Sequence, residues 1–215
     1  MRWGMTIDLT KCAGCCACAL ACKQEHFLPP GVTWGRVLYG EAGVYPMVTQ
    51  EILPILCNHC EDAPCVRVCP TGATTKREDG IVSIDCDACI GCRYCVIACP
   101  YQSRTFLSEE REYFQGKGYT AREKLGRQIY PLQEGTTIKC NFCMERIDAG
   151  MEKGLKPGQD REATPACVNA CYTRARVFGD LEDPESEISM LIRRMKGFQL
   201  HPEFGTNPSV YYFRY

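Results

Sequence analysis

Cysteine is the residue whose type and spacing indicate the chemistry of this chain. Eighteen of the 215 residues are cysteine, and sixteen of those fall into four groups of four. The groups are Cys12, Cys15, Cys18 and Cys22; Cys57, Cys60, Cys65 and Cys69; Cys89, Cys92, Cys95 and Cys99; and Cys140, Cys143, Cys167 and Cys171. In the first and third groups, two, two and three residues separate successive cysteines, which is the ligand spacing of bacterial 4Fe-4S clusters. Sixteen thiolates are enough for four such cubane clusters.

Disulfides and zinc are the two alternatives for so many cysteines. A comparable density in a short secreted chain indicates a disulfide scaffold. Cysteines two or three residues apart, however, rarely reach the Cα separation and the dihedral angle of a disulfide. Pairs of the form Cys-x-x-Cys also build zinc sites. Cubane clusters fit better than either, because in every group three residues separate the third cysteine from the fourth.

Charge and hydropathy exclude several classes of function. The net charge is −1 and the isoelectric point is near 6.3, so no basic field favours nucleic acid or an anionic membrane surface. No window approaches about eighteen consecutive apolar residues, and residues 1–9 alternate as a strand that leads directly to Cys12. We therefore expect neither a membrane-spanning segment nor a signal peptide in this chain. The expected location is the cytoplasm, or the periplasmic side after export together with a partner.

The chain also repeats itself. An Ile-Asp pair precedes Cys12 and Cys89 at the same distance, and residues 165–173 parallel residues 64–71. This pattern predicts a duplicated bacterial ferredoxin in which the fourth cysteine of a group binds a neighbouring cluster. The second and third groups would form one module, and the first and fourth would close a second module around it.

The same internal alignment identifies the two surplus cysteines. Cys16 occupies the position of Arg93 in the sister run, and Cys86 occupies the position of Leu9. Neither position carries a ligand in the sister motif. We interpret Cys86 as a small buried thiol and Cys16 as a semi-exposed one.

Two further elements can be predicted from local signals. Residues 73–76 and 81–84 form a hairpin pattern around a turn at residues 78–80. Near the end of the chain, Asp183 as N-cap and Pro184 at the first helical position predict a helix. One face of this helix would carry Ile188, Leu191, Ile192 and Met195 as ordinary packing.

At the level of whole motifs, the chain resembles the four-cluster iron–sulfur subunits of molybdenum or tungsten bis-pterin oxidoreductases, the dimethyl sulfoxide reductase superfamily. Small subunits of respiratory arsenate, polysulfide, thiosulfate and dimethyl sulfoxide reductases are similar at the same positions. The resemblance covers nearly the whole chain and is carried by Lys11 to Lys23, Cys57 to Ala73, Cys89 to Tyr101, Lys139 to Cys143, Phe178 to Pro184 and Gly205 to Tyr212.

The resemblance implies a ligand set for each of four 4Fe-4S clusters. The sets are Cys12, Cys15, Cys18 and Cys171 for cluster 1; Cys140, Cys143, Cys167 and Cys22 for cluster 2; Cys89, Cys92, Cys95 and Cys69 for cluster 3; and Cys57, Cys60, Cys65 and Cys99 for cluster 4. In that order the clusters would form a wire, with cluster 1 nearest the pterin subunit. No ligand is replaced by Trp or Asp. Tyr172 stands where many relatives have proline, which is expected to loosen or re-aim that turn.

The fold class that follows is α+β, with duplicated bacterial-ferredoxin-like modules, short β-hairpins, short helices and long loops around the four clusters. Residues 1–50 and 136–215 are expected to form the outer module with its C-terminal tail, and residues 51–107 the inner module. Residues 108–135 are expected to form a surface insertion. The segment from Tyr101 to Lys139 is rich in charge and tyrosine and has no cysteine, which is typical of a solvated loop or a docking element.

Side chains next to the ligands could adjust the clusters. Lys11, Arg93, Lys139 and Arg146 lie beside ligand cysteines in the sequence. A cation there would stabilise a reduced cluster and raise its potential, and the alternative is a solvated surface charge. His59 lies between two ligands and would either gate its cluster by protonation or make a structural hydrogen bond. His26 and His201 receive no role.

The function that these patterns predict is electron conduction within a heteromeric oxidoreductase. The implied partners are a large molybdenum or tungsten bis-pterin catalytic subunit and, as in many relatives, a membrane quinol-interacting subunit. No catalytic residue is expected in this chain, because no nucleophile or acid–base set lies outside the clusters. The alternative is a free-standing soluble polyferredoxin. The tail Tyr211-Tyr212-Phe213 and the insertion are the expected contacts with the catalytic subunit.

Overall fold

Short helices and short strands joined by long loops make up the fold. The computed structural model describes residues 1–214. The helices are α1 (Ala17–Glu25), α2 (Pro64–Arg67), α3 (Tyr94–Ile97), α4 (Ala121–Ile129), α5 (Met144–Glu152), α6 (Ala166–Asn169) and α7 (Glu187–Met195), with 3-10 turns at Arg161–Ala163 and Pro202–Phe204. The strands are β1 (Trp3–Asp8), β2 (Arg36–Val44), β3 (Met47–Ile55), β4 (Thr74–Lys76), β5 (Val82–Ile84), β6 (Thr105–Leu107), β7 (Thr136–Ile138), β8 (Arg176–Asp180) and β9 (Val210–Phe213). The expectation of mixed α and β structure with short elements is confirmed.

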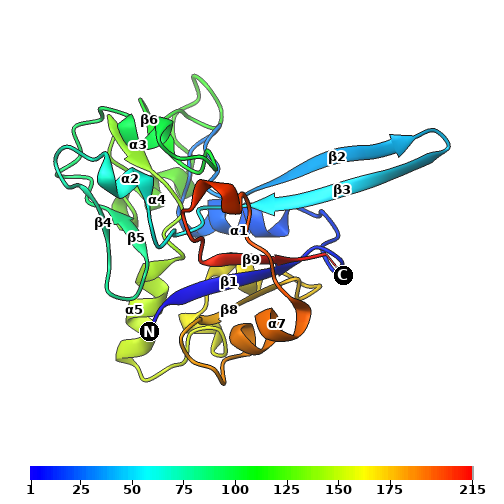
Figure 1. The fold of residues 1–215 in the computed structure, drawn as a ribbon. Helices are drawn as coiled ribbons and strands as arrows, with labels where there is room; N and C mark the ends of the chain where they lie inside the picture. Colours follow the sequence, from blue (N-terminus) through cyan, green and yellow to red (C-terminus); the bar gives the residue numbers. More distant parts are fainter. Residues whose placement is uncertain (215) are drawn as a thin grey trace.

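A three-stranded sheet joins segments from the two ends of the sequence. Its strand order is β8-β1-β9, with β1 antiparallel to β8 and parallel to β9. The predicted strand in residues 1–9 is thus confirmed as β1, the central strand, and every one of its residues is buried. Because β1 leads into the first cysteine group and β8 follows the fourth, the sheet brings these two groups together (Figure 1).

The C-terminal tail forms part of this sheet. Tyr212 is fully buried, and its hydroxyl donates a 3.0 Å hydrogen bond to the carbonyl oxygen of Pro54. Phe213 is 2% exposed. The expectation that the tail contacts a partner is therefore wrong for these two residues. Their aromatic rings are part of the core of the chain itself.

The predicted hairpin of residues 73–84 is confirmed as β4 and β5, with Thr75 opposite Ser83. Strands β6 and β7 also pair, so that the two ends of residues 108–135 lie side by side. Within that segment, α4 begins at a capping box made by Thr120 and Glu123. Its Gly126 packs closely against Phe27 at the end of α1. Helix α4 of this segment therefore packs against the rest of the chain, while most residues of the segment are exposed.

The predicted C-terminal helix is confirmed, but its start lies three residues later than expected. The N-cap of α7 is Ser186, whose hydroxyl oxygen accepts a hydrogen bond from the backbone N–H of Ser189. The Asp183 carboxylate instead accepts from the backbone N–H of Glu185 and forms a turn before the helix. The pair Asp183-Pro184 therefore belongs to the loop before α7. Serine is as good an N-cap as aspartate, and here Ser186 caps the helix.

The hairpin of β2 and β3 was not expected from the sequence. Figure 1 shows this hairpin projecting away from the rest of the molecule on the side of α1. Its base covers the loop of the first cysteine group, where the Tyr39 hydroxyl donates to the Gly14 carbonyl oxygen. Its tip exposes the apolar side chains of Val44, Tyr45 and Met47. Residue 50, where we expected the outer module to be interrupted, lies inside β3.

Within residues 1–214, no helix has the length and apolar character needed to cross a membrane.

Candidate iron–sulfur centres

The loops of the first and third cysteine groups have the same backbone conformation. Gly14 and Gly91 both have a φ of 67°. Two residues later, Cys16 and Arg93 have φ values of 59° and 65° and directly precede α1 and α3. Left-handed backbone at two places bends the chain tightly, and glycine permits one of them without strain. This geometry lets three thiols of a group surround one point before the helix carries the fourth away.

The turns that follow the fourth cysteines are also equivalent. The backbone N–H of Gly72 donates to the Cys69 carbonyl oxygen, and Arg174 makes the same bond to Cys171 at 3.0 Å. Both turns end in left-handed backbone. Tyr172 therefore does not re-aim the turn as expected, because the bond between the flanking residues is retained. Its ring is exposed instead.

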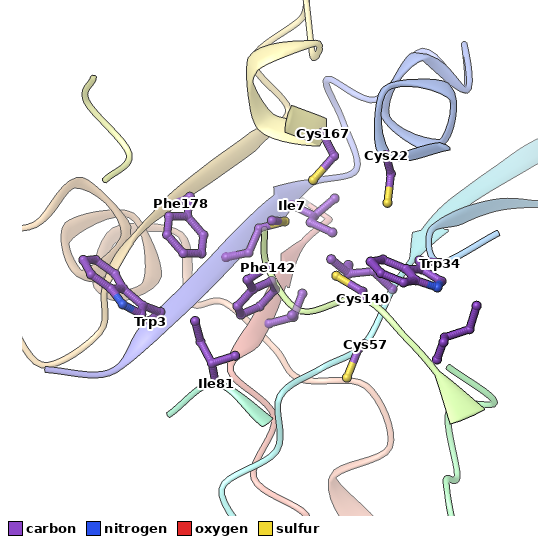
Figure 2. Packing of buried hydrophobic residues seen from close by; sticks show 14 of the residues in the cluster. Trp3, Ile7, Cys22, Trp34, Cys57, Ile81, Cys140, Phe142, Cys167 and Phe178 are labelled. Atoms are coloured by element: carbon purple, nitrogen blue, oxygen red, sulfur yellow. The ribbon is translucent and has the colours of Figure 1, made fainter. Parts of the chain in front are cut away.

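The thiols assigned to cluster 2 converge from three parts of the chain. Burial raises the pKa of the Cys22 thiol, and the charges of Cys140, Cys167 and Cys143 raise it further. Helix α1, which carries Cys22, packs against α6, which carries Cys167. Figure 2 shows Cys22 and Cys167 on one side of Cys140. The fourth cysteine of the first group thus lies among the thiols of the last group.

The thiols assigned to clusters 1 and 4 show the same exchange between groups. Burial raises the pKa of Cys12, with additional effects of the Cys18 and Cys171 charges. Burial also raises the pKa of Cys60 to about 12, and the neighbouring thiols act in the same direction. The neighbours of Cys60 are Cys57, Cys65 and Cys99. In both places a thiol from a distant group completes the set.

The remaining set, assigned to cluster 3, is built around two short helices. Helix α2 packs against α3. Cys95 lies in α3, and Cys69 follows shortly after α2. The Cys69 sulfur accepts a 3.4 Å hydrogen bond from the backbone N–H of Thr74. A backbone donor of this kind stabilises a thiolate.

The order of the four sets differs from the order expected from the sequence. Burial raises the pKa of Cys140 to about 12, and the next largest effect comes from Cys57. Cys57 and Cys140 belong to the same buried cluster of side chains, which Figure 2 shows. The cluster 4 set, which contains Cys57, therefore lies beside the cluster 2 set. The sets therefore run in the order 1, 2, 4, 3, because Cys57, and no cysteine of the cluster 3 set, shares a buried cluster with Cys140.

The burial of the cysteines agrees with the order 1, 2, 4, 3. All four cysteines of the cluster 2 set are buried, as are Cys57, Cys60 and Cys65 of the cluster 4 set. The two exposed thiols are Cys15 and Cys92, which belong to the sets for clusters 1 and 3. The two ends of the row therefore reach the surface, and its middle is buried apart from the partly exposed Cys99.

The donor set fits iron–sulfur clusters. All eighteen cysteines lie in the described part of the chain, and all are free thiols. Burial and mutual repulsion make the enclosed thiols weak acids, and a bound cation shifts such thiols to the thiolate form. Within residues 1–214, no three His, Cys, Asp or Glu side chains are placed to hold a single metal ion. A cubane distributes its ligands over four irons, so its thiolates stand farther apart than those around one ion.

The two surplus cysteines lie outside these sets. The Cys16 sulfur lies 3.3 Å from the Tyr39 hydroxyl of β2 and is partly exposed, as expected. Cys86 is also partly exposed, so the expectation of a buried thiol is wrong. Burial raises the pKa of its thiol, and the nearby Thr136 lowers it by less.

Replacing either surplus cysteine by serine is expected to leave the iron content unchanged, because neither thiol joins one of the four sets. The measurement is iron per chain after anaerobic purification of Cys16→Ser and Cys86→Ser. A loss of about four irons, one cubane, from either variant would contradict the assignment.

The histidines divide differently than the sequence suggested. His59 makes the structural hydrogen bond, in which its Nδ1 accepts from the backbone N–H of Val82 at 3.0 Å. Burial and the charges of Lys139 and Arg104 hold the pKa of His59 well below its usual value. His26, which received no role, places Nε2 3.3 Å from the Cys143 sulfur, and burial lowers its pKa to about 4. A neutral imidazole is therefore the form that contacts this thiol, and only its position four residues after Cys22 could have indicated it.

The four cations that lie near ligands in the sequence have different surroundings. Lys11 is exposed and pairs with Asp8, as the solvated alternative predicts. Arg93 stacks on the Phe106 ring, and Arg146 pairs with Glu25. Lys139, in contrast, is 4% exposed.

Two further buried cations, Arg104 and Arg176, were missed. Each lies five residues after the last cysteine of a group, Cys99 or Cys171. That repeated spacing was the available signal.

Comparisons with known proteins agree with this arrangement. Residues 48–132 match the family model of the 4Fe-4S dicluster domain. The chain is 42% identical to a selenate reductase component of Mesobacillus selenatarsenatis, over 99% of this chain and 72% of that protein. It is 41% identical to the arsenate respiratory reductase iron-sulfur subunit ArrB of a Shewanella species, over 100% of this chain and 97% of that protein. It is 37% identical to a tetrathionate reductase component of Salmonella typhimurium, over 98% of this chain and 72% of that protein.

The chain belongs to the family of iron–sulfur electron-transfer subunits of the dimethyl sulfoxide reductase superfamily. The resemblance seen in its motifs is therefore confirmed. Members of this family carry 4Fe-4S clusters and are subunits of larger enzyme complexes. Electron transfer is thus the role of this chain, and the cysteine sets described above are its candidate cluster sites.

Proposed function

We propose that this chain relays electrons between a molybdenum or tungsten bis-pterin catalytic subunit and a second redox partner. Four 4Fe-4S clusters, held by the sixteen cysteines in the sets given above, would supply one-electron transfer. The observation that carries the proposal is the exposure of the cysteines, with Cys15 and Cys92 at the surface and, in the two middle sets, every cysteine but the partly exposed Cys99 buried. Enclosed middle sites limit loss of electrons to solvent, and exposed terminal sites allow exchange with a partner.

The two ends of the row carry apolar surface suited to protein contacts. Near Cys15, the side chains of Leu20 and Tyr172 are exposed, and the β2–β3 hairpin begins there. Near Cys92, the exposed side chains are Ile90, Tyr94 and Ile97. Exposed apolar groups gathered at one place are typical of interaction sites. We assign the Cys15 end to the catalytic subunit and the Cys92 end to the second partner, a membrane quinol-interacting subunit where one exists.

In this proposal the chain is not catalytic by itself. The inner module, residues 51–107, would hold clusters 3 and 4, and the outer module, residues 1–50 and 136–215, would hold clusters 1 and 2 around it. Residues 108–135 would remain a surface insertion that supports α1. The chain would work in the cytoplasm, or on the periplasmic side after export with its partner.

Mild anaerobic purification from the native host tests the proposal. We expect a complex with a much larger subunit, molybdenum or tungsten in that complex, and about sixteen iron and sixteen acid-labile sulfide per chain of this subunit. Zinc in place of iron, or fewer than about twelve iron per chain, would contradict the cluster count. A stable, cluster-loaded monomer without either metal that still accepts electrons would support the free polyferredoxin instead.

A further inference from the structure

Three cations are buried among the cysteine sets. Arg104, Lys139 and Arg176 are 6%, 4% and 5% exposed. Within residues 1–214, no carboxylate forms an ion pair with any of them. A buried charge without a partner is costly. These cations therefore need an anion, and the groups near them are thiols.

Arg176 lies between the sets for clusters 1 and 2. Its guanidinium is buried, and the thiols of Cys167 and Cys18 lie near enough for a negative charge on either one to act on it. Cys167 belongs to the cluster 2 set and Cys18 to the cluster 1 set. The Arg176 charge in turn acts to lower the pKa of the Cys167 thiol, against the larger effect of burial. A further contact of the guanidinium is weak, with Nη1 3.4 Å from the Met5 sulfur.

Arg104 has the same position between the sets for clusters 4 and 3. Its guanidinium is buried, and the thiols of Cys65, Cys57 and Cys95 lie near enough for a negative charge on any of them to act on it. Nη1 donates a 3.1 Å hydrogen bond to the Thr74 hydroxyl. Nη2 is buried without a protein partner among the described residues. This unpartnered N–H group lies beside cysteines that belong to both sets.

Lys139 completes the row at the junction between the modules. Its Nζ donates to the carbonyl oxygen of Val82 and, at 2.7 Å, to that of Cys140. Its charge acts on the thiol of Cys140 in the cluster 2 set and on that of Cys65 in the cluster 4 set. Each junction of the order 1, 2, 4, 3 thus has one buried cation.

We propose that Arg176, Lys139 and Arg104 each raise the reduction potentials of the two clusters between which they lie. The proposal rests on the ligand sets given under Proposed function. A cluster with four thiolate ligands is an anion and gains a further negative charge on reduction. A fixed cation in a buried, weakly screened place stabilises the reduced form more than the oxidised form. A cation shared by two neighbours also reduces the repulsion between them, which keeps electron transfer along the row from becoming strongly uphill.

The internal repeat supports a common role for the two arginines. Arg104 and Arg176 both follow the fourth cysteine of a group by five residues. Both come after a turn with equivalent geometry, in which Gln102 and Arg174 donate to the carbonyl oxygens of Cys99 and Cys171. The same local structure therefore delivers a guanidinium to the same kind of junction twice.

The test is a potentiometric titration followed by electron paramagnetic resonance, in the complex purified from its host. In Arg176→Gln we expect clusters 1 and 2 to move to more negative potentials, with clusters 3 and 4 unchanged. In Arg104→Gln we expect clusters 3 and 4 to move to more negative potentials, with clusters 1 and 2 unchanged. Arg176→Lys keeps the charge and should stay close to the wild type.

Lys11→Gln is the matched control, because Lys11 adjoins Cys12 but is exposed and paired with Asp8. The reduction potentials of all four clusters should be unchanged in this variant. Loaded Arg176→Gln protein with unmoved potentials, or a uniform shift of all clusters, would overturn the proposal while leaving the proposed function intact. Lys139→Gln is an independent test, in which clusters 2 and 4 are expected to move to more negative potentials. If all three glutamine variants lost their clusters while the charge-preserving Arg176→Lys stayed loaded, the cations would serve cluster retention, and the proposal would be wrong.

Discussion

Cys22→Ser is expected to remove cluster 2 and to leave cluster 1 intact. Cys22 follows the other three cysteines of its group in the sequence, yet its sulfur lies among Cys140, Cys143 and Cys167. It is also carried there by α1, which packs against α6, the helix that holds Cys167. A serine hydroxyl is a poor ligand for iron in a cubane, so the cluster completed by Cys22 should be lost or remain incomplete. Iron per chain should fall by about four.

Electron paramagnetic resonance of the reduced protein identifies which cluster is affected. The control is Cys16→Ser, because Cys16 lies at the start of the same helix and should keep all its clusters. Loss of the cluster 1 signal alone in Cys22→Ser would contradict the exchange of the fourth cysteine. The reciprocal variant Cys171→Ser should remove cluster 1 and spare cluster 2.

Removal of iron is expected to destabilise the inner region more than the β8-β1-β9 sheet. The buried cluster around α2 and α3 consists of Cys60, Ala63, Cys65, Val82, Cys95 and Tyr101, so half of its members are proposed ligands. The larger cluster around β1 has four cysteines among its nineteen buried residues. Without iron, the smaller group of buried side chains loses the metal–thiolate bonds that join half of its members. Binding of metal by its ligands contributes directly to the folding free energy of such sites.

Hydrogen exchange of the anaerobically chelated chain measures this difference. Amides of β4 and β5 should exchange about tenfold faster or more after chelation, whereas amides of β1 should change less. Reconstitution with iron and sulfide should restore protection. An equal loss of protection in β1 and in β4 would show that the clusters support the whole chain uniformly.

Much of the fold near the ligands could be predicted from the sequence. The hairpin of β4 and β5 and the strand β1 follow from local alternation and turn residues. The equivalence of the first and third groups extends to the backbone, where Gly14 and Gly91 have the same φ. These features depend on contacts within a few residues, which spacing and residue type express directly.

Three features could not be predicted in the same way. The β2–β3 hairpin turns at Tyr45-Pro46, where no Asp-Gly pair like that of residues 79–80 marks the turn. The predicted start of α7 was wrong because Asp183 and Ser186 are both good N-cap residues. They are distinguished only by the hydrogen bond that the Ser186 hydroxyl oxygen accepts from the backbone N–H of Ser189. The tail residue Tyr212 was assigned to the surface because its aromatic character suits both an interface and a core.

The sequence by itself determined the cofactor class and the local wrapping of the cysteines, because a cluster loop is closed by neighbouring residues. It also indicated which group lends its fourth cysteine, through the resemblance and the internal repeat. Only the tertiary structure decided the order of the sets, since that order depends on Cys57 lying beside Cys140, eighty-three positions later in the sequence. Likewise, only packing decided that Lys139 is buried while Lys11 is solvated, because both follow the same local rule of a cation next to a ligand.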